Sequence, residues 1–140
     1  MAYYALLDEN NIVTQVITGR DEDEEVNGIT DWEEYYGNRH GCVCKRTSYN
    51  TEGNQHLYGK TPFRGNFGAV GHVYDEELDV FLPPQPFLSW SLNTDTYQWD
   101  SPTPYPDDYD HLYYWDEETL NWIMVEPPAL PDNPPPVDAP

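Results

Sequence analysis

The chain has 140 residues, the length of one ordinary domain with a single core. Its 26 acidic residues against six Lys and Arg give a formal net charge of -20. Such a chain repels nucleic acid and anionic membrane surfaces, because binding phosphate requires cationic side chains. We therefore expect no nucleic-acid or membrane partner, and favour basic protein surfaces, cations, or neutral surfaces met through aromatic side chains.

The charge is unevenly distributed. All basic residues lie between Arg20 and Arg64, and acidic residues continue to the C-terminus without a Lys or Arg. High acidity is typical of disorder, but the 15% aromatic content supplies enough apolar surface for a folded chain. The sequence shows no secretory signal and no run of about 18 apolar residues, so we expect neither a signal peptide nor a membrane span.

The N-terminal part predicts a hairpin and one helix. In residues 3–18, apolar and β-branched residues flank an Asn-rich turn at 8–11, which indicates a hairpin. The acidic run 21–25 is predicted to be an exposed loop. A short helix is expected at about 30–37, capped by Thr30 or Asp31 and stopped by Gly37. Three aromatic residues fall on one face of this helix: Trp32, Tyr35 and Tyr36.

Residues 41–49 return to extended structure, and 50–71 are rich in Gly and Asn. The second stretch predicts a long loop with one or two short strands near Phe63, Phe67 and Val70. A loop of this length in a compact domain is usually functional or held by a partner.

The second half contains one pattern three times, at residues 74–81, 92–99 and 115–122. Each copy has a large apolar residue, then Asp or Asn, and a second large apolar residue seven positions after the first. Prolines follow each copy within a few residues. The repetition predicts small hairpins strung on extended Pro-rich linkers.

These elements predict a mainly β fold of short antiparallel hairpins with one short helix, Pro-rich linkers and a Pro-rich C-terminal tail. The expected segments are 1–72 (hairpin, helix and Gly/Asn-rich loop), 73–126 (three hairpin units) and 127–140 (tail). A lone hairpin is marginal in water, so the units must pack on each other, on the N-terminal part or on another protein. The residues expected to bind a partner are Tyr74, Phe81, Trp90, Trp99, Trp115, Trp122, Pro127 and Pro128.

Two cysteines and two histidines offer soft metal ligands: His40, Cys42, Cys44 and His56. They are weak candidates, because a structural zinc site usually shows two paired knuckles, and two small buried thiols beside a surface histidine explain the pattern better. Calcium binding at Asp107, Asp108 and Asp110 is outweighed by solvated turns. We expect no cofactor. A Cys42–Cys44 disulfide would be strained, and two free thiols suit synthesis in a reducing cytosol.

Catalytic motifs are not evident in the sequence. A glycosidase needs two carboxylates at a defined separation, and nothing singles out such a pair. Phosphate loops, nucleophile elbows and dinucleotide fingerprints are missing from the sequence. The Trp residues could stack on sugar rings, but at strand positions of small hairpins packing is their commoner use. We therefore expect a protein that is not an enzyme.

Several stretches resemble small virion-associated proteins of marine tailed phages, mainly cyanophages: residues 1–13, 47–51, 61–68, 83–90 and the last hairpin. The resemblance covers most of the chain up to about Val125, and the acidic run 21–25 and the tail 127–140 are less typical. It implies a structural role in a virion, for a protein that is synthesised in the host cytoplasm.

The leading expectation is a capsid decoration or cement protein, present in many copies, that stabilises the shell of the major capsid protein or binds other virion proteins. The alternative is a tail or fibre adsorption module that binds host glycans through aromatic residues.

Overall fold

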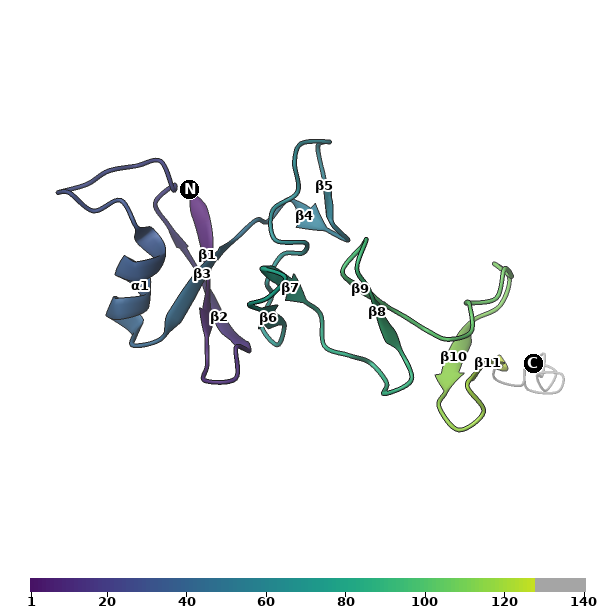
Figure 1. The fold of residues 1–140 in the computed structure, drawn as a ribbon. Coiled ribbons are helices and arrows are strands. Elements are labelled where there is room, and N and C mark those ends of the chain that lie inside the picture. The colour runs from purple at the N-terminus through teal and green to yellow at the C-terminus, as the bar shows by residue number, and fades with distance from the viewer. Residues whose placement is uncertain (128–140) are drawn as a thin grey trace, which may run out of the picture. The chain divides into compact units, whose positions relative to one another are not determined.

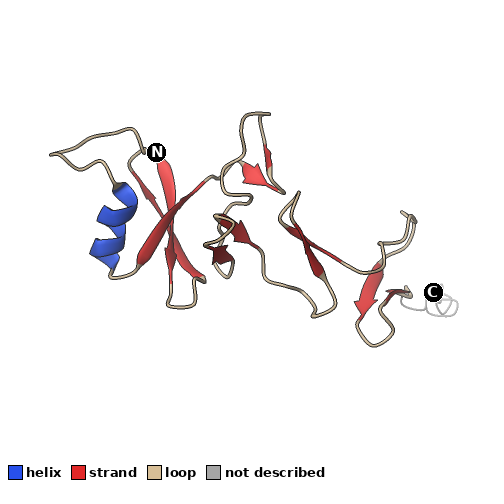
Figure 2. Ribbon diagram, in the orientation of Figure 1, coloured by secondary structure: helices blue, strands red, loops and turns tan. Residues whose placement is uncertain are grey.

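The computed structural model describes residues 1–127, and the expected tail beyond Pro127 lies outside the described residues. The chain divides into two compact units, Met1–Ser101 (unit 1) and Pro102–Pro140 (unit 2, described to residue 127). The fold is mainly β with one short helix, as predicted (Figure 1, Figure 2). The expected segment boundary at residue 72 falls inside unit 1.

Unit 1 begins with a three-stranded antiparallel sheet of order β2-β1-β3, formed by β1 (Ala2–Leu7), β2 (Val13–Gly19) and β3 (Val43–Thr47). The Asn-rich turn predicted between β1 and β2 is present. Asp8 Oδ1 accepts hydrogen bonds from the backbone N–H of Asn10 (2.8 Å) and of Ile12 (3.0 Å). Asn11 takes a left-handed φ of 62°, which Asn tolerates better than most residues.

The single described helix, α1 (Trp32–His40), is longer than expected. Asp31 caps its N-terminus by accepting the backbone N–H of Glu34, and Gly41 ends it with a φ of 68°. The expectation that Gly37 stops the helix is wrong. Gly37 is a buried packing position inside α1, where a Cβ would lie 2.7 Å from the carbonyl oxygen of Cys42.

Both faces of β1 are covered, which explains its nearly continuous apolar sequence. Ala2, Tyr4 and Leu6 face α1 and pack with Trp32 and Cys44. Ala5 and Leu7 face the opposite side and pack with three residues outside β1: Val13, Tyr74 and Phe81. The core of unit 1 thus has two layers, one on each side of the sheet.

The Gly/Asn-rich stretch forms a hairpin that the sequence placed wrongly. Its strands are β4 (Thr51–Glu52) and β5 (Gln55–His56), not segments around Phe63, Phe67 and Val70. Gly53 and Asn54 connect them, both with a φ of 58°, which suits a two-residue hairpin loop. The remainder of the stretch has no regular strand.

The three repeats form three hairpins: β6 (Val73–Asp75) with β7 (Val80–Leu82), β8 (Ser91–Asn93) with β9 (Gln98–Asp100), and β10 (Tyr113–Asp116) with β11 (Asn121–Met124). The two apolar residues seven positions apart are directly opposed in each hairpin. The pairs are Tyr74–Phe81, Leu92–Trp99 and Trp115–Trp122.

The loops of the three hairpins are also alike. The fourth loop residue of each has a left-handed φ: Asp79 (55°), Tyr97 (53°) and Leu120 (52°). The Asp or Asn that starts the turn bonds within it. Asp75 Oδ1 accepts the N–H of Leu78 at 3.0 Å, and Asp116 Oδ2 accepts the Thr119 hydroxyl at 2.7 Å. The repeat is therefore one structural module used three times.

Candidate interaction surfaces

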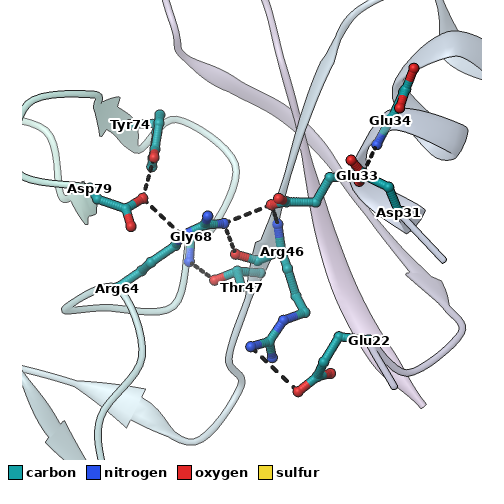
Figure 3. Close-up of polar contacts among 10 residues, drawn as sticks. All are labelled: Glu22, Asp31, Glu33, Glu34, Arg46, Thr47, Arg64, Gly68, Tyr74 and Asp79. Atoms are coloured by element: carbon teal, nitrogen blue, oxygen red, sulfur yellow. Dashed lines mark hydrogen bonds and ion pairs between the residues drawn. The ribbon is translucent and has the colours of Figure 1, made fainter. Parts of the chain in front are cut away.

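Arg64 is the centre of a polar network in unit 1 (Figure 3). Its Nη1 donates to Glu33 Oε2 at 2.8 Å and to the carbonyl oxygen of Arg46 at 2.9 Å, and its Nε lies 2.9 Å from Asp79 Oδ1. The Tyr74 hydroxyl donates to the same oxygen of Asp79. Burial alone would lower the pKa of Arg64, but the hydrogen bond and charge of Glu33 outweigh it and raise that pKa. One side chain thus joins α1, β3 and the β6–β7 hairpin.

An open pocket of about 420 Å³ lies beside this network. The Phe63 ring contacts two guanidinium groups, with Cζ of Arg46 3.9 Å and Cζ of Arg64 4.9 Å from its centroid. Glu22 neutralises Arg46 across 3.5 Å, as Glu33 does Arg64. Arg46 and Arg64 are thus each paired with a carboxylate, and Asp31, which also lines the pocket, accepts the Glu34 N–H, so the charged groups hold the elements around the pocket together.

Asn66 is the second polar centre and is completely buried. Its Nδ2 donates to the carbonyl oxygens of Phe81 (2.8 Å) and Tyr97 (2.9 Å). Its Oδ1 accepts the N–H of Gly53 (2.9 Å) and the Nε2 of Gln98 (2.6 Å). Both donors and both acceptor positions of the amide are used, and the amide links the three hairpins of unit 1 that follow the sheet.

The loop that carries both centres requires small residues. Gly65 has a φ of 74°, and a Cβ there would lie 2.8 Å from the Tyr97 ring. A Cβ on Gly68 would lie 2.5 Å from the Phe81 ring. The loop 61–68 is therefore a packing junction held by this chain's own elements.

The metal candidates are not brought together as a site. Within residues 1–127, no group of three or more His, Cys, Asp or Glu side chains is placed to hold a metal ion. His40 ends α1, and His56 lies in β5, where its Nδ1 accepts the N–H of Tyr58 at 3.0 Å. Cys44 is buried, and burial raises its pKa to about 12, which opposes the thiolate that a metal requires. Cys42 is a half-buried free thiol.

The predicted partner-binding residues of the first hairpin lie in the core. Tyr74 is 5% exposed and Phe81 is fully buried, so neither side chain is accessible to a partner in this structure. Their rings pack on each other with centroids 5.3 Å apart. The aromatic pair fastens the hairpin to the sheet.

The tryptophans also make contacts within the chain. Trp90 packs on Phe87 with ring centroids 5.8 Å apart. Trp99 is half-buried, and its indole N–H donates to the carbonyl oxygen of Pro83 at 2.7 Å. The preceding Pro-rich linker is thereby tied to the β8–β9 hairpin.

The same kind of hydrogen bond, from an indole N–H to a carbonyl oxygen of the preceding linker, is present in unit 2. Trp122 donates its indole N–H to the carbonyl oxygen of Thr103 at 2.8 Å, and its ring lies edge-on to Trp115 (5.2 Å) and Tyr105 (4.9 Å). Trp115 is 7% exposed. The pair defines an inner face of the β10–β11 hairpin that the linker covers. Pro127 is exposed, and Pro128 lies outside the described residues.

Sequence reasoning missed the other side of this hairpin. Leu112, Tyr114, Ile123 and Val125 form what we call the outer face: Tyr114 opposes Ile123, and Val125 donates its N–H to the carbonyl oxygen of Leu112 at 2.7 Å. Leu112, Tyr114 and Val125 are 71%, 54% and 42% exposed. The signal in the sequence is the row of apolar residues at the strand positions next to the Trp pair, which alternation places on the opposite side of the hairpin.

Comparison with protein-family profiles, with characterised proteins and with solved structures finds no match to this chain. In the described part of the chain, no helix is long and apolar enough to cross a membrane.

Proposed function

We propose that this chain is a non-enzymatic structural protein of a tailed-phage particle, which decorates the shell by binding the major capsid protein or other virion proteins in many copies. The observation that carries the proposal is the series of hairpin modules. Two of them are tied to their own preceding linker by an indole N–H, at Trp99 and Trp122. The first two modules pack within unit 1, and the third is tied to its own linker in unit 2. A locally folded module that follows a Pro-rich linker suits a chain laid over other proteins.

The charge distribution supports a basic protein surface as the partner. No Lys or Arg follows Arg64, and the hairpin loops are rich in carboxylates such as Glu76, Glu77, Glu117 and Glu118. In this proposal the carboxylates meet Lys and Arg on the shell, and the buried area links neighbouring subunits. Nucleic acid and anionic membranes are disfavoured by the same charge.

Catalysis has no part in the proposal. The two polar networks around Arg64 and Asn66 join secondary-structure elements of unit 1. Their groups are occupied by backbone and side-chain partners of the same chain, which is the arrangement of a structural junction.

The tail-fibre alternative requires aromatic faces that are free to stack on sugars. Trp99 and Trp122 direct their indole N–H groups to backbone carbonyls, and Trp115 is buried. These contacts favour a packing role for the rings. Labelling of particles with a specific antibody distinguishes the two roles, because decoration predicts signal over the head and adsorption predicts signal confined to the tail.

Quantitative mass spectrometry of purified particles tests the proposal. We expect the protein in a fixed ratio to the major capsid protein after density-gradient purification, and release by high salt if carboxylate–cation contacts dominate. Recovery only from the soluble lysate, with none in the particles, would contradict the proposed role.

A further inference from the structure

The three hairpin modules allow the same strand positions to be compared in one chain. The outer pair next to the central apolar pair is Val73–Leu82 in the first module, Ser91–Asp100 in the second and Tyr114–Ile123 in the third. These pairs are structurally equivalent, because the opposed residues and the left-handed loop position coincide in all three modules.

The chemistry of each outer pair follows its surroundings in the first two modules. The first pair is apolar: Leu82 is buried at 8% exposure within unit 1, and Val73 is 36% exposed and forms a β-bridge with Ile12. Ser91 and Asp100 are both exposed, and the pair there is polar. An apolar pair at this position therefore accompanies a face that is covered at Leu82, and a polar pair accompanies a solvent-facing one.

The third module departs from this relation. Its outer pair is apolar, and the next pair along the ladder, Leu112 and Val125, extends the outer face. Three of the four residues are exposed by 42% or more. A contiguous exposed apolar face of this kind is typical of an interaction site.

The negative charge around the outer face favours a partner surface with positive charge. Asp116 lies on the same side of the hairpin by register, and Asp110 and Glu126 adjoin the face in sequence. Residues 102–127 contain no Lys or Arg. Two copies meeting through this face would bring like charges together, whereas a Lys- or Arg-rimmed surface would meet complementary charge.

We infer that the outer face of the β10–β11 hairpin is a docking surface for a different protein, one that presents an apolar centre bordered by Lys and Arg. This rests on the proposed function only in taking a protein as the partner, and it does not depend on that protein being part of a virion. The apolar side chains supply affinity, and the carboxylates supply partner selection and orientation.

The test uses the full chain and two synthetic peptides with the same amphipathic helical pattern, one of Leu and Lys and the other of Leu and Glu. Binding is followed by amide chemical shifts in NMR titrations. We expect the Leu/Lys peptide to shift the signals of Leu112, Tyr114, Ile123 and Val125, and the Leu/Glu peptide to bind at least about tenfold more weakly.

The key variant is Tyr114→Ser with Ile123→Asp, which installs the polar pair of the second module. We expect it to weaken Leu/Lys peptide binding about tenfold or more, because two apolar anchors are lost. The matched control is Tyr58→Ser with Leu57→Asp, which makes the same chemical change at two exposed residues of unit 1 and should leave binding unchanged. Near-ultraviolet circular dichroism of the Trp115–Trp122 pair checks folding, and Tyr114→Ser alone replaces the double variant if that signal is lost.

Four results would overturn the inference. The first is binding of the Leu/Lys peptide to the key variant as tightly as to the unchanged chain, and the second is binding of the Leu/Glu peptide as tightly as the Leu/Lys peptide. The third is dimerisation through the outer face, measured by sedimentation velocity. The fourth is a large gain in peptide binding when the chain ends at Pro127, which would make residues 128–140 the occupant. Failure to find the protein in particles would remove the virion role and leave this docking surface standing, so the two failures can be distinguished.

Discussion

Asn66 connects three hairpins of unit 1, because one amide has two donors and two acceptor positions. Its donors point at the carbonyl oxygens of Phe81 and Tyr97, and its oxygen receives Gly53 and Gln98. The position is specific for an amide, since a carboxylate of the same shape would set oxygen against carbonyl oxygen.

Replacing Asn66 by Asp is expected to destabilise unit 1 by about 2–4 kcal/mol, because two buried donors are lost and a charge is buried. Urea unfolding followed by Trp fluorescence measures the change. Asn54→Asp is the control: Asn54 Nδ2 also bonds a carbonyl oxygen, that of Asp95, at an exposed site, and its effect should stay within about 0.5 kcal/mol. Equal losses for the two variants would show that burial of the Asn66 amide is unimportant.

Asp108 organises the start of the last hairpin. Its Oδ2 accepts the Tyr113 hydroxyl at 2.8 Å and lies 2.7 Å from Nδ1 of His111. The hydrogen bond from Tyr113, followed by that from His111, lowers the pKa of the carboxyl below its ordinary value of 3.8. A lowered pKa in the folded state means that ionised Asp108 stabilises unit 2 above pH 3.8, and that this contribution is lost as the pH falls through the folded pKa.

The variant Tyr113→Phe removes the main cause of this shift, and we expect the pKa of Asp108 to rise toward 3.8. Carboxyl carbon chemical shifts followed by NMR across the acid range measure it. Tyr114→Phe is the matched control, because Tyr114 lies on the opposite side of the strand. A pKa that is the same in both variants would exclude the Tyr113 hydroxyl as its cause.

The hairpin module is the element that the sequence predicted best. Apolar residues seven positions apart with Asp or Asn after the first lead to a directly opposed pair, because two strand residues and a four-residue loop separate them. The helix and the β4–β5 hairpin were predicted less well. Gly37 looked like a helix stop, and its role depends on the approach of the Cys42 carbonyl from a following segment. The Gly53–Asn54 turn could not be singled out, because the stretch 50–71 contains many other Gly and Asn residues that also suit turns.

The residues predicted to bind a partner show even more clearly that local sequence does not reveal contacts distant in sequence. Large apolar side chains at Tyr74 and Phe81 look alike in sequence whether they face a partner or the core. Local pattern fixes which residues are opposed within a hairpin, but the side that is covered depends on contacts distant in sequence, such as the packing of Phe81 against Gly68. The roles of Arg64 and Asn66 were unpredictable for the same reason.

Leu120 provides a test of the module's loop. It adopts a φ of 52°, a left-handed conformation that costs a residue with a Cβ about 1–2 kcal/mol. We expect Leu120→Gly to be more stable than Leu120→Ala by about 1 kcal/mol, although Gly is ordinarily the less stable of the two. Thermal unfolding followed by near-ultraviolet circular dichroism of the Trp115–Trp122 pair provides the measurement. A more stable Ala variant would mean that the loop is not held left-handed in solution.

At the scale of the molecule, the chain divides at Ser101 into two compact units. The β8–β9 hairpin belongs to unit 1, because Asn66 bonds Tyr97 and Gln98, and the Gly65 backbone lies against the Tyr97 ring. Within unit 2, the indole N–H of Trp122 donates a hydrogen bond to the carbonyl oxygen of Thr103 and holds the linker against the hairpin.

Two truncations test this division. A chain ending at Ser101 is expected to unfold at nearly the same temperature as unit 1 in the full protein. A chain ending at Pro86 removes β8–β9 and should unfold at a clearly lower temperature, because Asn66 is left with unmade hydrogen bonds in a buried position. Differential scanning calorimetry compares them. A large loss of stability on ending at Ser101 would show that the two units depend on each other.

The bond from Trp122 to Thr103 spans only 19 residues, and that from Trp99 to Pro83 spans 16. Loops this short close quickly, so each of these two hairpins and its linker can fold soon after synthesis. The short sequence separation of these contacts also determines how the hairpins respond to a pulling force. A hairpin pulled by its two ends opens one backbone hydrogen bond at a time, so the last module is expected to lengthen under tension while Asn66 and Arg64 keep unit 1 intact. A protein attached at both ends would then yield at β10–β11 first and recover when the tension falls.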